Sequence, residues 1–300
     1  MLNNTYGGIF MKFVLEPGKV LKPTSDVVFK NLMKNEKNKD FLAKIISIVT
    51  KLDYDYVLNN IRITDTDTLE SNISNHYNTG DLVVNIENTK INIEASRNNI
   101  EINKRKNEIT AFKYASNSYK KGELYDIVHV FYQICIENYN IFNNNLLITE
   151  VNLVDVSSGN YEIETEEFKK FHICLNNIDK ECYNKLTEEE RYIMLLATDD
   201  IAKLNKIAGE NDIMKKVVND LIDLSNDSDV ISAYEKEKIE QYAFEVALKE
   251  KEAKGKKSGI EFGKKERNIE IAKNLLNENI DKNIISKTTG LSLDEINNLK

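Results

Sequence analysis

The chain has 300 residues, 30% of them charged, and a formal net charge of -8. This length suits one sizeable domain, or one domain with a helical appendage. The acidic balance argues against a protein that coats nucleic acid, but it is compatible with an enzyme that has a local basic groove. No apolar run approaches the roughly 20 residues needed to cross a bilayer, so we expect no membrane partner. Residues 1–20 are expected to be a leader without order, with Met1 or Met11 as the start.

The cysteines and histidines give no metal-binding or disulfide pattern. The odd count and wide spacing of Cys135, Cys174 and Cys182 exclude a disulfide framework and favour a reducing cytoplasm. Grouping His172 with Cys174 and Cys182 does not produce the C-x2-C spacing typical of zinc sites. We interpret these residues as buried or surface residues without a ligand role.

The pattern over residues 21–180 predicts an α/β domain, a central mixed sheet flanked by helices. Thr24 or Ser25 is expected to cap a first helix with Asp26 in its first turn. A second helix is predicted over 38–52. The remaining expected elements are strands over 56–64, 81–86, 91–96, 128–137, 146–156 and 168–176, a polar loop over 65–80, and a helix over 98–121 that ends at Gly122.

From Thr187 onward the pattern is helical, beginning with a capping box of Thr187 and Glu190. We expect a separate helical region over 187–300 through which chains can form a homo-oligomer. Its expected segments are helices over 187–208, 210–224 and 229–254, a hinge or frayed helix over 249–267, and short helices over 266–278, 281–288 and 292–300.

The end of the chain resembles a helix-turn-helix, with Thr289 and Gly290 between two short helices. Asp294 and Glu295 head the second of these helices. A recognition helix normally carries Arg and Lys, so we interpret the tail as a packing or partner-binding element more than as a DNA reader.

The segment from Gly80 to Ser96 carries the candidate chemistry. As a hairpin with a four-residue loop over 87–90, it pairs Ile86 with Ile91 and Val84 with Ile93, which forms one apolar face. On the opposite face Asp81 and Glu94 become diagonal neighbours, roughly 7–8 Å apart at Cα.

Two carboxylates at this separation can share one hard cation through oxygen ligands. Bound Mg²⁺ or Mn²⁺ lowers the pKa of a water molecule and stabilises charge on a phosphate, as phosphodiester hydrolysis requires. Taken from spacing alone, Asp81 and Glu94 are equally compatible with a solvated hairpin face.

Four stretches together resemble the Rpn-type branch of the PD-(D/E)XK nuclease superfamily, whose members are described as transposases. Asp81 and the run Ile93-Glu94-Ala95-Ser96 are similar to the superfamily's metal-binding core. Three further stretches support the resemblance. Lys22–Lys30 is similar to the family's opening D-x-x-F-K helix, and Tyr114–Tyr125 is similar to its Y-S-x-x-L-x-x-G-E-x-Y segment. Glu270–Ile296 is similar to its ending, I-A-K-x-L-L followed by T-G-L-S-x-x-E-I.

The resemblance implies roles for individual residues. Asp81 and Glu94 would be metal ligands, and Asp26 an acidic helper on the first helix, although an Asp at that position also simply favours the helix dipole. Ser96 stands where the family has Gln, Lys or Asn. A serine hydroxyl can hydrogen-bond a water molecule but supplies no positive charge, which Lys104 or Lys106 of the next helix would have to provide.

The helix after the hairpin is basic, with seven Lys or Arg against two Glu over residues 97–121. Since this helix lies beside the active-site strands in PD-(D/E)XK folds, we expect it to follow the phosphates of double-stranded DNA. The residues expected to contact DNA are Lys104, Arg105, Lys106 and Lys113.

The resemblance predicts a metal-dependent DNA endonuclease linked to recombination or mobile elements. A second hypothesis, favoured by Ser96, is a catalytically degenerate member that binds DNA or a protein partner without cleaving. A third is a helical interaction protein or inhibitor built around residues 187–300.

Overall fold

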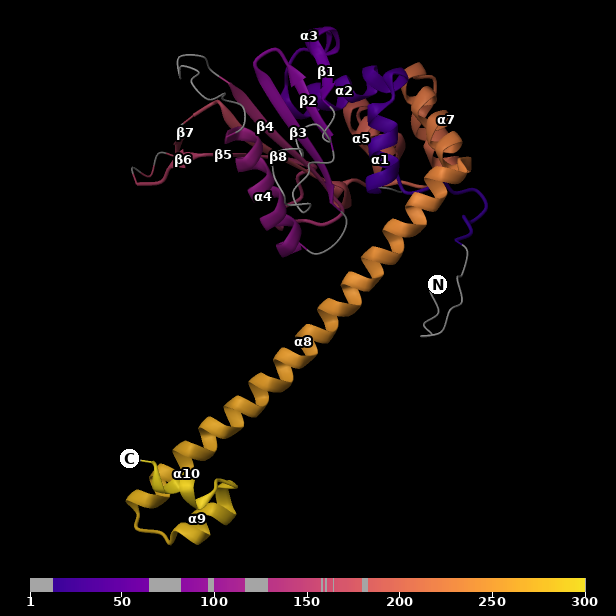
Figure 1. Cartoon of the computed structure of the whole chain (residues 1–300). Helices are drawn as coiled ribbons and strands as arrows, with labels where there is room; N and C mark the ends of the chain where they lie inside the picture. The colour runs from indigo at the N-terminus through magenta and orange to yellow at the C-terminus, as the bar shows by residue number, and fades with distance from the viewer. Residues whose placement is uncertain are drawn as a thin grey trace. The chain divides into compact units, whose positions relative to one another are not determined.

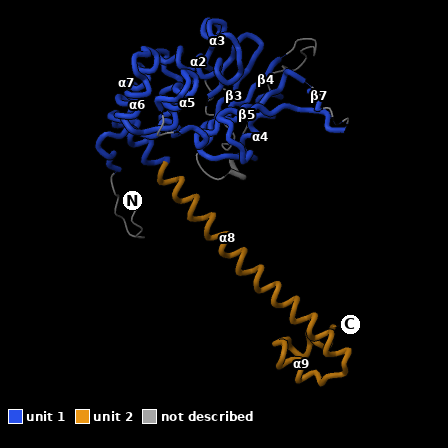
Figure 2. Tube along the Cα trace, turned by 180° about the vertical axis from the view of Figure 1, so that it is seen from behind, with its two compact units in different colours: residues 1–237 blue, residues 238–300 orange. Residues whose placement is uncertain are grey.

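The computed structural model describes residues 13–64, 82–96, 100–116, 129–157, 159, 161–163, 165–179 and 183–299, without the side chains of 100–103 and 162. These residues belong to two compact units, 1–237 and 238–300, coloured separately in Figure 2. Asp81, Cys182, the predicted loop over 65–80 and the helix end at Gly122 lie outside the described residues.

A mixed sheet forms the centre of the first unit, and its described strands run in the order β1-β2-β3-β4-β8-β5. The inner strands β3, β4 and β8 are parallel, whereas β1, β2 and β5 pair antiparallel with their neighbours. The strands are β1 (Ile61–Thr64), β2 (Leu82–Ile86), β3 (Thr89–Ser96), β4 (Val130–Glu137), β5 (Ile148–Asn152) and β8 (Phe168–Cys174), with a separate pair β6 (Val154–Asp155) and β7 (Glu162–Ile163).

Helices cover both faces of this sheet (Figure 1). The helix α4 (Ile100–Ser116) follows β3 and precedes β4, as a crossover between parallel strands requires, and lies on one face. The helices that cover the other face are α1 (Asp26–Lys34), α2 (Lys39–Thr50), α3 (Tyr54–Asn60), α5 (Glu188–Ala197), α6 (Ile201–Ala208) and α7 (Asp212–Asn226). Short 3₁₀ helices span Glu36–Asn38, Leu175–Asn177 and Tyr183–Lys185.

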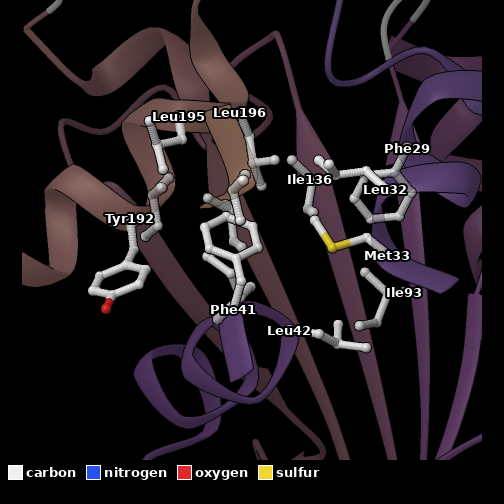
Figure 3. Packing of buried hydrophobic residues seen from close by; sticks show 14 of the residues in the cluster. Phe29, Leu32, Met33, Phe41, Leu42, Ile93, Ile136, Tyr192, Leu195 and Leu196 are labelled. Atoms are coloured by element: carbon white, nitrogen blue, oxygen red, sulfur yellow. The ribbon is translucent and has the colours of Figure 1, made fainter. Parts of the chain in front are cut away.

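The main core lies between the sheet and the larger group of helices (Figure 3). Ile93 of β3 and Ile136 of β4 face Leu42 of α2 and Met33 of α1 across it, and all four are buried. Burying one such side chain stabilises the fold by about 1.5–3 kcal/mol. Ser25 fixes the start of α1 because its Oγ accepts a hydrogen bond from the Val28 amide at 3.2 Å, as the capping pattern predicts.

The predicted four-residue hairpin loop is wrong. Residues 87 and 88 alone make the turn, with Glu87 in the left-handed region at φ 50°, and Ile86 pairs with Thr89. The register is therefore shifted by two residues, and Val84 pairs with Ile91. A two-residue shift preserves which side chains share a face, so the apolar face survives the error.

Other segments also differ from expectation. The predicted strand over 56–64 is mostly the helix α3 followed by the four residues of β1. The predicted hinge or frayed helix over 249–267 lies within one continuous helix, α8 (Ser228–Asn277), which runs through Gly255, Gly259 and Gly263. Among the described helices, none is both long and apolar enough to cross a membrane.

The boundary between the two units lies after residue 237, whereas the helical region was expected to begin at residue 187. The helices α5, α6 and α7 bury apolar faces, including Tyr192, Leu204 and Leu221, in the core of the first unit. The division falls after residue 237 because these three helices complete the sheet's cover. A helical protein built around 187–300 alone would leave these faces exposed.

Part of the expected leader is ordered. Val20 and Leu21 are buried, the Val20 amide donates to the Asp199 carbonyl at 2.8 Å, and Lys19 pairs with Asp200 in a β-bridge. These contacts tie residues 13–21 to the core.

The second unit contains the end of α8 with α9 (Lys282–Thr289) and α10 (Leu293–Asn297). Its small core is formed by Ala272, Ile285, Leu291 and Ile296. Gly290 ends α9 at φ 74°, where a side chain would be strained.

Candidate nuclease site beneath helix α4

The two faces of the sheet differ in chemistry. The face toward α1 and α2 is apolar, whereas the face beneath α4 carries a buried polar layer from three parallel strands. Because paired residues on parallel strands share a face, the layer forms rows across the sheet. The rows are Asn92–Gln133–Lys170, Glu94–Cys135–His172 and Ser96–Glu137–Cys174.

Glu94 is one of two buried carboxylates in the described part of this layer, with 1% of its side chain exposed. Its Oε1 accepts a hydrogen bond from Asn92 Nδ2 at 3.2 Å, and its Oε2 lies 3.4 Å from Nζ of Lys106 on α4. Burial raises the pKa of Glu94 because a charged carboxylate loses its hydration, while Lys106 and the Asn92 amide act in the opposite direction. A cation beside Glu94 is thus already part of the structure.

The four basic residues predicted on α4 are placed differently from one another. Lys104 and Arg105 are exposed to solvent. Lys106 instead turns toward the sheet, and 39% of its side chain stays exposed. Lys113 is half-buried in the last turn of the helix.

Ser96 lies two residues beyond Glu94 on the same face of β3 and is 8% exposed. It ends the strand beside Glu137 of β4. Its side chain is a neutral hydroxyl, so it brings no positive charge to Glu94, and its predicted role in the site stays a prediction.

Asp26 lies at the start of α1 and forms an ion pair with Lys30 at 3.0 Å. The end of β4 is tied to this helix start because Asn138 Nδ2 donates to Thr24 Oγ1 at 3.4 Å. Lys30 is also close enough to Glu94 to help lower the pKa of that carboxyl. The Lys30 side chain of α1 is therefore within electrostatic reach of Glu94.

The predicted diagonal placement of Asp81 and Glu94 rested on a register with Val83 opposite Glu94, which is wrong because Val83 pairs with Asn92 and Leu82 with Ile93. Asp81 itself lies outside the described residues, so its role as a metal ligand stays a prediction.

The sequence did not predict that Cys135, Glu137 and His172 belong to the same polar layer as Glu94. Glu137 Oε2 lies 2.9 Å from His172 Nδ1, and the Tyr139 hydroxyl donates to Glu137 Oε1 at 3.3 Å. Cys135 is fully buried next to them, and burial raises the pKa of its thiol. The available signal was the alternation Gln133-Cys135-Glu137 in an otherwise apolar strand, which marks a polar face.

A mixed sheet with helices on both faces and an acidic residue on the strand before the crossover helix is the architecture of PD-(D/E)XK nucleases, the fold class expected from the sequence. The family model of PD-(D/E)XK nuclease family transposases matches residues 23–251, so the chain belongs to this family. Residues 265–300 match the C-terminal HTH domain of the Rpn/YhgA-like nuclease family, which agrees with the helix-turn-helix resemblance of the tail. No curated protein and no solved structure gives a significant match.

Proposed function

We propose that this chain is a metal-dependent DNA endonuclease that hydrolyses phosphodiester bonds. One observation supports the proposal beyond family membership: Glu94 is held on β3 as a buried carboxylate, next to a lysine. This is the residue to which the resemblance of the Ile93–Ser96 run assigns a metal-ligand role. Such a group costs free energy unless a cation compensates it, so it is better explained by a site than by stability.

The residues present fit a hard divalent ion. Glu94 offers carboxylate oxygens, and Asp81, one residue before β2, would supply the second carboxylate. Mg²⁺ or Mn²⁺ bound there would acidify a water molecule and stabilise charge on the phosphate.

The residues of the chain then have distinct roles. Lys106 supplies the positive charge that Ser96 lacks and would neutralise the transferred phosphate. The Ser96 hydroxyl would hydrogen-bond the attacking water. Asp26 would act as an acidic helper from α1, its charge tuned by the ion pair with Lys30.

Double-stranded DNA would be held by the exposed face of α4. Lys104 and Arg105 project into solvent on the same helix that directs Lys106 toward Glu94. Phosphate contacts from these residues would position the backbone over the site without reading sequence. The tail over 265–300 would add a DNA contact or a partner contact, and homo-oligomers would form through the C-terminal helices. We propose a role in recombination or mobile-element biology, because the family is one of transposases. We also propose a cytoplasmic location, because the cysteine pattern favours a reducing compartment.

Ser96 supports a second candidate, a degenerate member that binds DNA without cutting. Nicking or linearisation of supercoiled plasmid with Mg²⁺, with Mn²⁺ and with EDTA distinguishes the two. We expect the wild type to cleave only with metal, and Glu94→Gln to lower the cleavage rate by at least about 100-fold. The matched control is Glu150→Gln, which removes an exposed carboxylate from β5 and should cleave at the wild-type rate.

Cleavage by Glu94→Gln at the wild-type rate would overturn the site. Absence of cleavage by folded wild-type protein that still shifts duplex DNA in a gel would establish the binding-only function.

A further inference from the structure

A second cluster of ligand-type side chains lies in the polar layer, one strand away from Glu94. Cys135 and Glu137 of β4 and His172 of β8 bring a thiol sulfur, a carboxylate oxygen and an imidazole nitrogen within 4.8 Å of one another. All three are buried, with exposures of 0%, 1% and 4%. We propose that these residues bind a zinc ion, separate from the ion of the proposed nuclease site.

The strand register builds this cluster. Cys135 and His172 are direct partners on parallel strands, and Glu137 follows two residues later on the same face. A zinc ion with bonds of about 2.0–2.3 Å in a tetrahedron holds its ligand atoms about 3.3–3.8 Å apart. The Nδ1–Oε2 separation of 2.9 Å must widen slightly, and the sulfur must move closer, which side-chain rotation allows.

The surrounding groups support a bound metal and not only a hydrogen-bonded core. Two buried amides approach the Cys135 sulfur, Asn107 Nδ2 at 3.4 Å and Gln133 Nε2 at 3.8 Å. Amide donors of this kind stabilise a metal-bound thiolate. The Tyr139 hydroxyl, bonded to Glu137 Oε1, leaves Oε2 to face His172 and the cluster.

A partnerless acceptor beside the cluster gives an independent indication. The Asn107 side chain is completely buried, and its Oδ1 has no hydrogen-bond partner among the described residues. A buried acceptor without a partner costs about 1–3 kcal/mol, so such atoms call for an ion or a water molecule. A water molecule bound to the ion as its fourth ligand would donate to Oδ1, while Nδ2 keeps its hydrogen bond to the Cys135 sulfur.

The ligand types select the ion. A thiolate, an imidazole and a carboxylate together suit zinc, whereas Mg²⁺ and Ca²⁺ prefer oxygen ligands alone. Two anionic ligands also balance the double charge of the ion, which makes the complex neutral in a buried layer. Binding releases the thiol proton of Cys135 to solvent, and the neutral imidazole of His172 carries its hydrogen on Nε2 so that Nδ1 can bind the ion.

Zinc content of the purified full-length protein, measured by mass spectrometry after dialysis against metal-free buffer, tests the proposal. Cobalt titration adds a spectroscopic readout, because a tetrahedral Co²⁺–thiolate complex gives charge-transfer and visible absorption. We expect one zinc per chain, and a cobalt spectrum that zinc abolishes.

The variants separate this site from its neighbours. Cys135→Ser should remove the charge-transfer band, and Asn107→Ala should weaken zinc binding about 10–100-fold. Cys174→Ser is the matched control, since Cys174 is also buried on this face but donates to the Tyr139 carbonyl at 3.1 Å. Glu94→Gln should keep its zinc.

Wild-type protein without zinc and without cobalt absorption would overturn the proposal and leave a buried polar network. Loss of zinc in Cys174→Ser but not in Cys135→Ser would equally refute the assignment. Neither result depends on DNA cleavage, so failure of the zinc proposal is distinguishable from failure of the nuclease proposal.

Discussion

Replacing Lys106 with methionine isolates the charge that compensates Glu94. Methionine retains an unbranched stem of similar length, so the change removes the ammonium group with little loss of packing. Glu94 is then a buried carboxylate that has lost the nearer of the two cations acting on it, and its pKa, already raised by burial, rises further.

The magnitude follows from the geometry of the pair. Removing one partner of a fully buried ion pair costs about 3–5 kcal/mol. Here 39% of the Lys106 side chain is exposed, and the Nζ–Oε2 distance of 3.4 Å is longer than that of a strong charge-assisted bond. Solvent screening reduces the cost, and we expect Lys106→Met to lose about 1–2 kcal/mol at neutral pH.

The loss must depend on pH with a definite sign. Because the pKa of Glu94 in the folded protein is raised, the folded chain keeps a proton at pH values where the unfolded chain has released it, and Lys106→Met extends this range upward. The penalty of the variant is therefore full above the higher pKa that Glu94 has in the variant. It disappears as the pH falls through the pKa that Glu94 has in the wild type, where the carboxyl is neutral in both folded proteins.

Urea denaturation of wild type, Lys106→Met, Glu94→Gln and the double variant, at neutral and at mildly acidic pH, gives the coupling energy. In the Glu94→Gln background Lys106→Met should cost nearly nothing. An equal cost in both backgrounds, or a cost independent of pH, would show that Lys106 stabilises the fold through packing and would refute the electrostatic reasoning.

Three further predictions test the core, the helix cap and the DNA-binding face. Phe41→Ala should destabilise the protein by about 3–5 kcal/mol in urea denaturation, because the fully buried ring leaves a cavity; a loss below 1 kcal/mol would contradict the packing in Figure 3. Ser25→Ala should cost about 1 kcal/mol by removing the acceptor for the Val28 amide, and Ser25→Asp, which keeps an acceptor, should recover part of it. Lys104→Gln should weaken duplex DNA binding and reduce its salt slope by about 1 without changing the cleavage rate at saturating DNA; an unchanged slope would remove this residue from the DNA interface.

Local chemistry in the sequence determined several features. Ser25 before Asp26 predicted the start of α1, and the Thr187–Glu190 capping box predicted the start of α5, since a cap needs only neighbouring residues. The alternation that predicted strands β2 and β3 also placed Glu94 and Ser96 on one face, and the succession of motifs indicated the family.

Tertiary structure decided what depends on residues distant in the chain. The turn at residues 87–88 fixed the hairpin register, and both registers satisfy the same apolar alternation. The burial of α5–α7 against the sheet moved the unit boundary to residue 237, because an amphipathic helix does not specify which surface it covers. The meeting of Cys135 and Glu137 with His172 arises from the parallel pairing of β4 with β8. No sequence spacing encodes this alignment, in which each residue of β4 pairs with the residue 37 positions later in the chain.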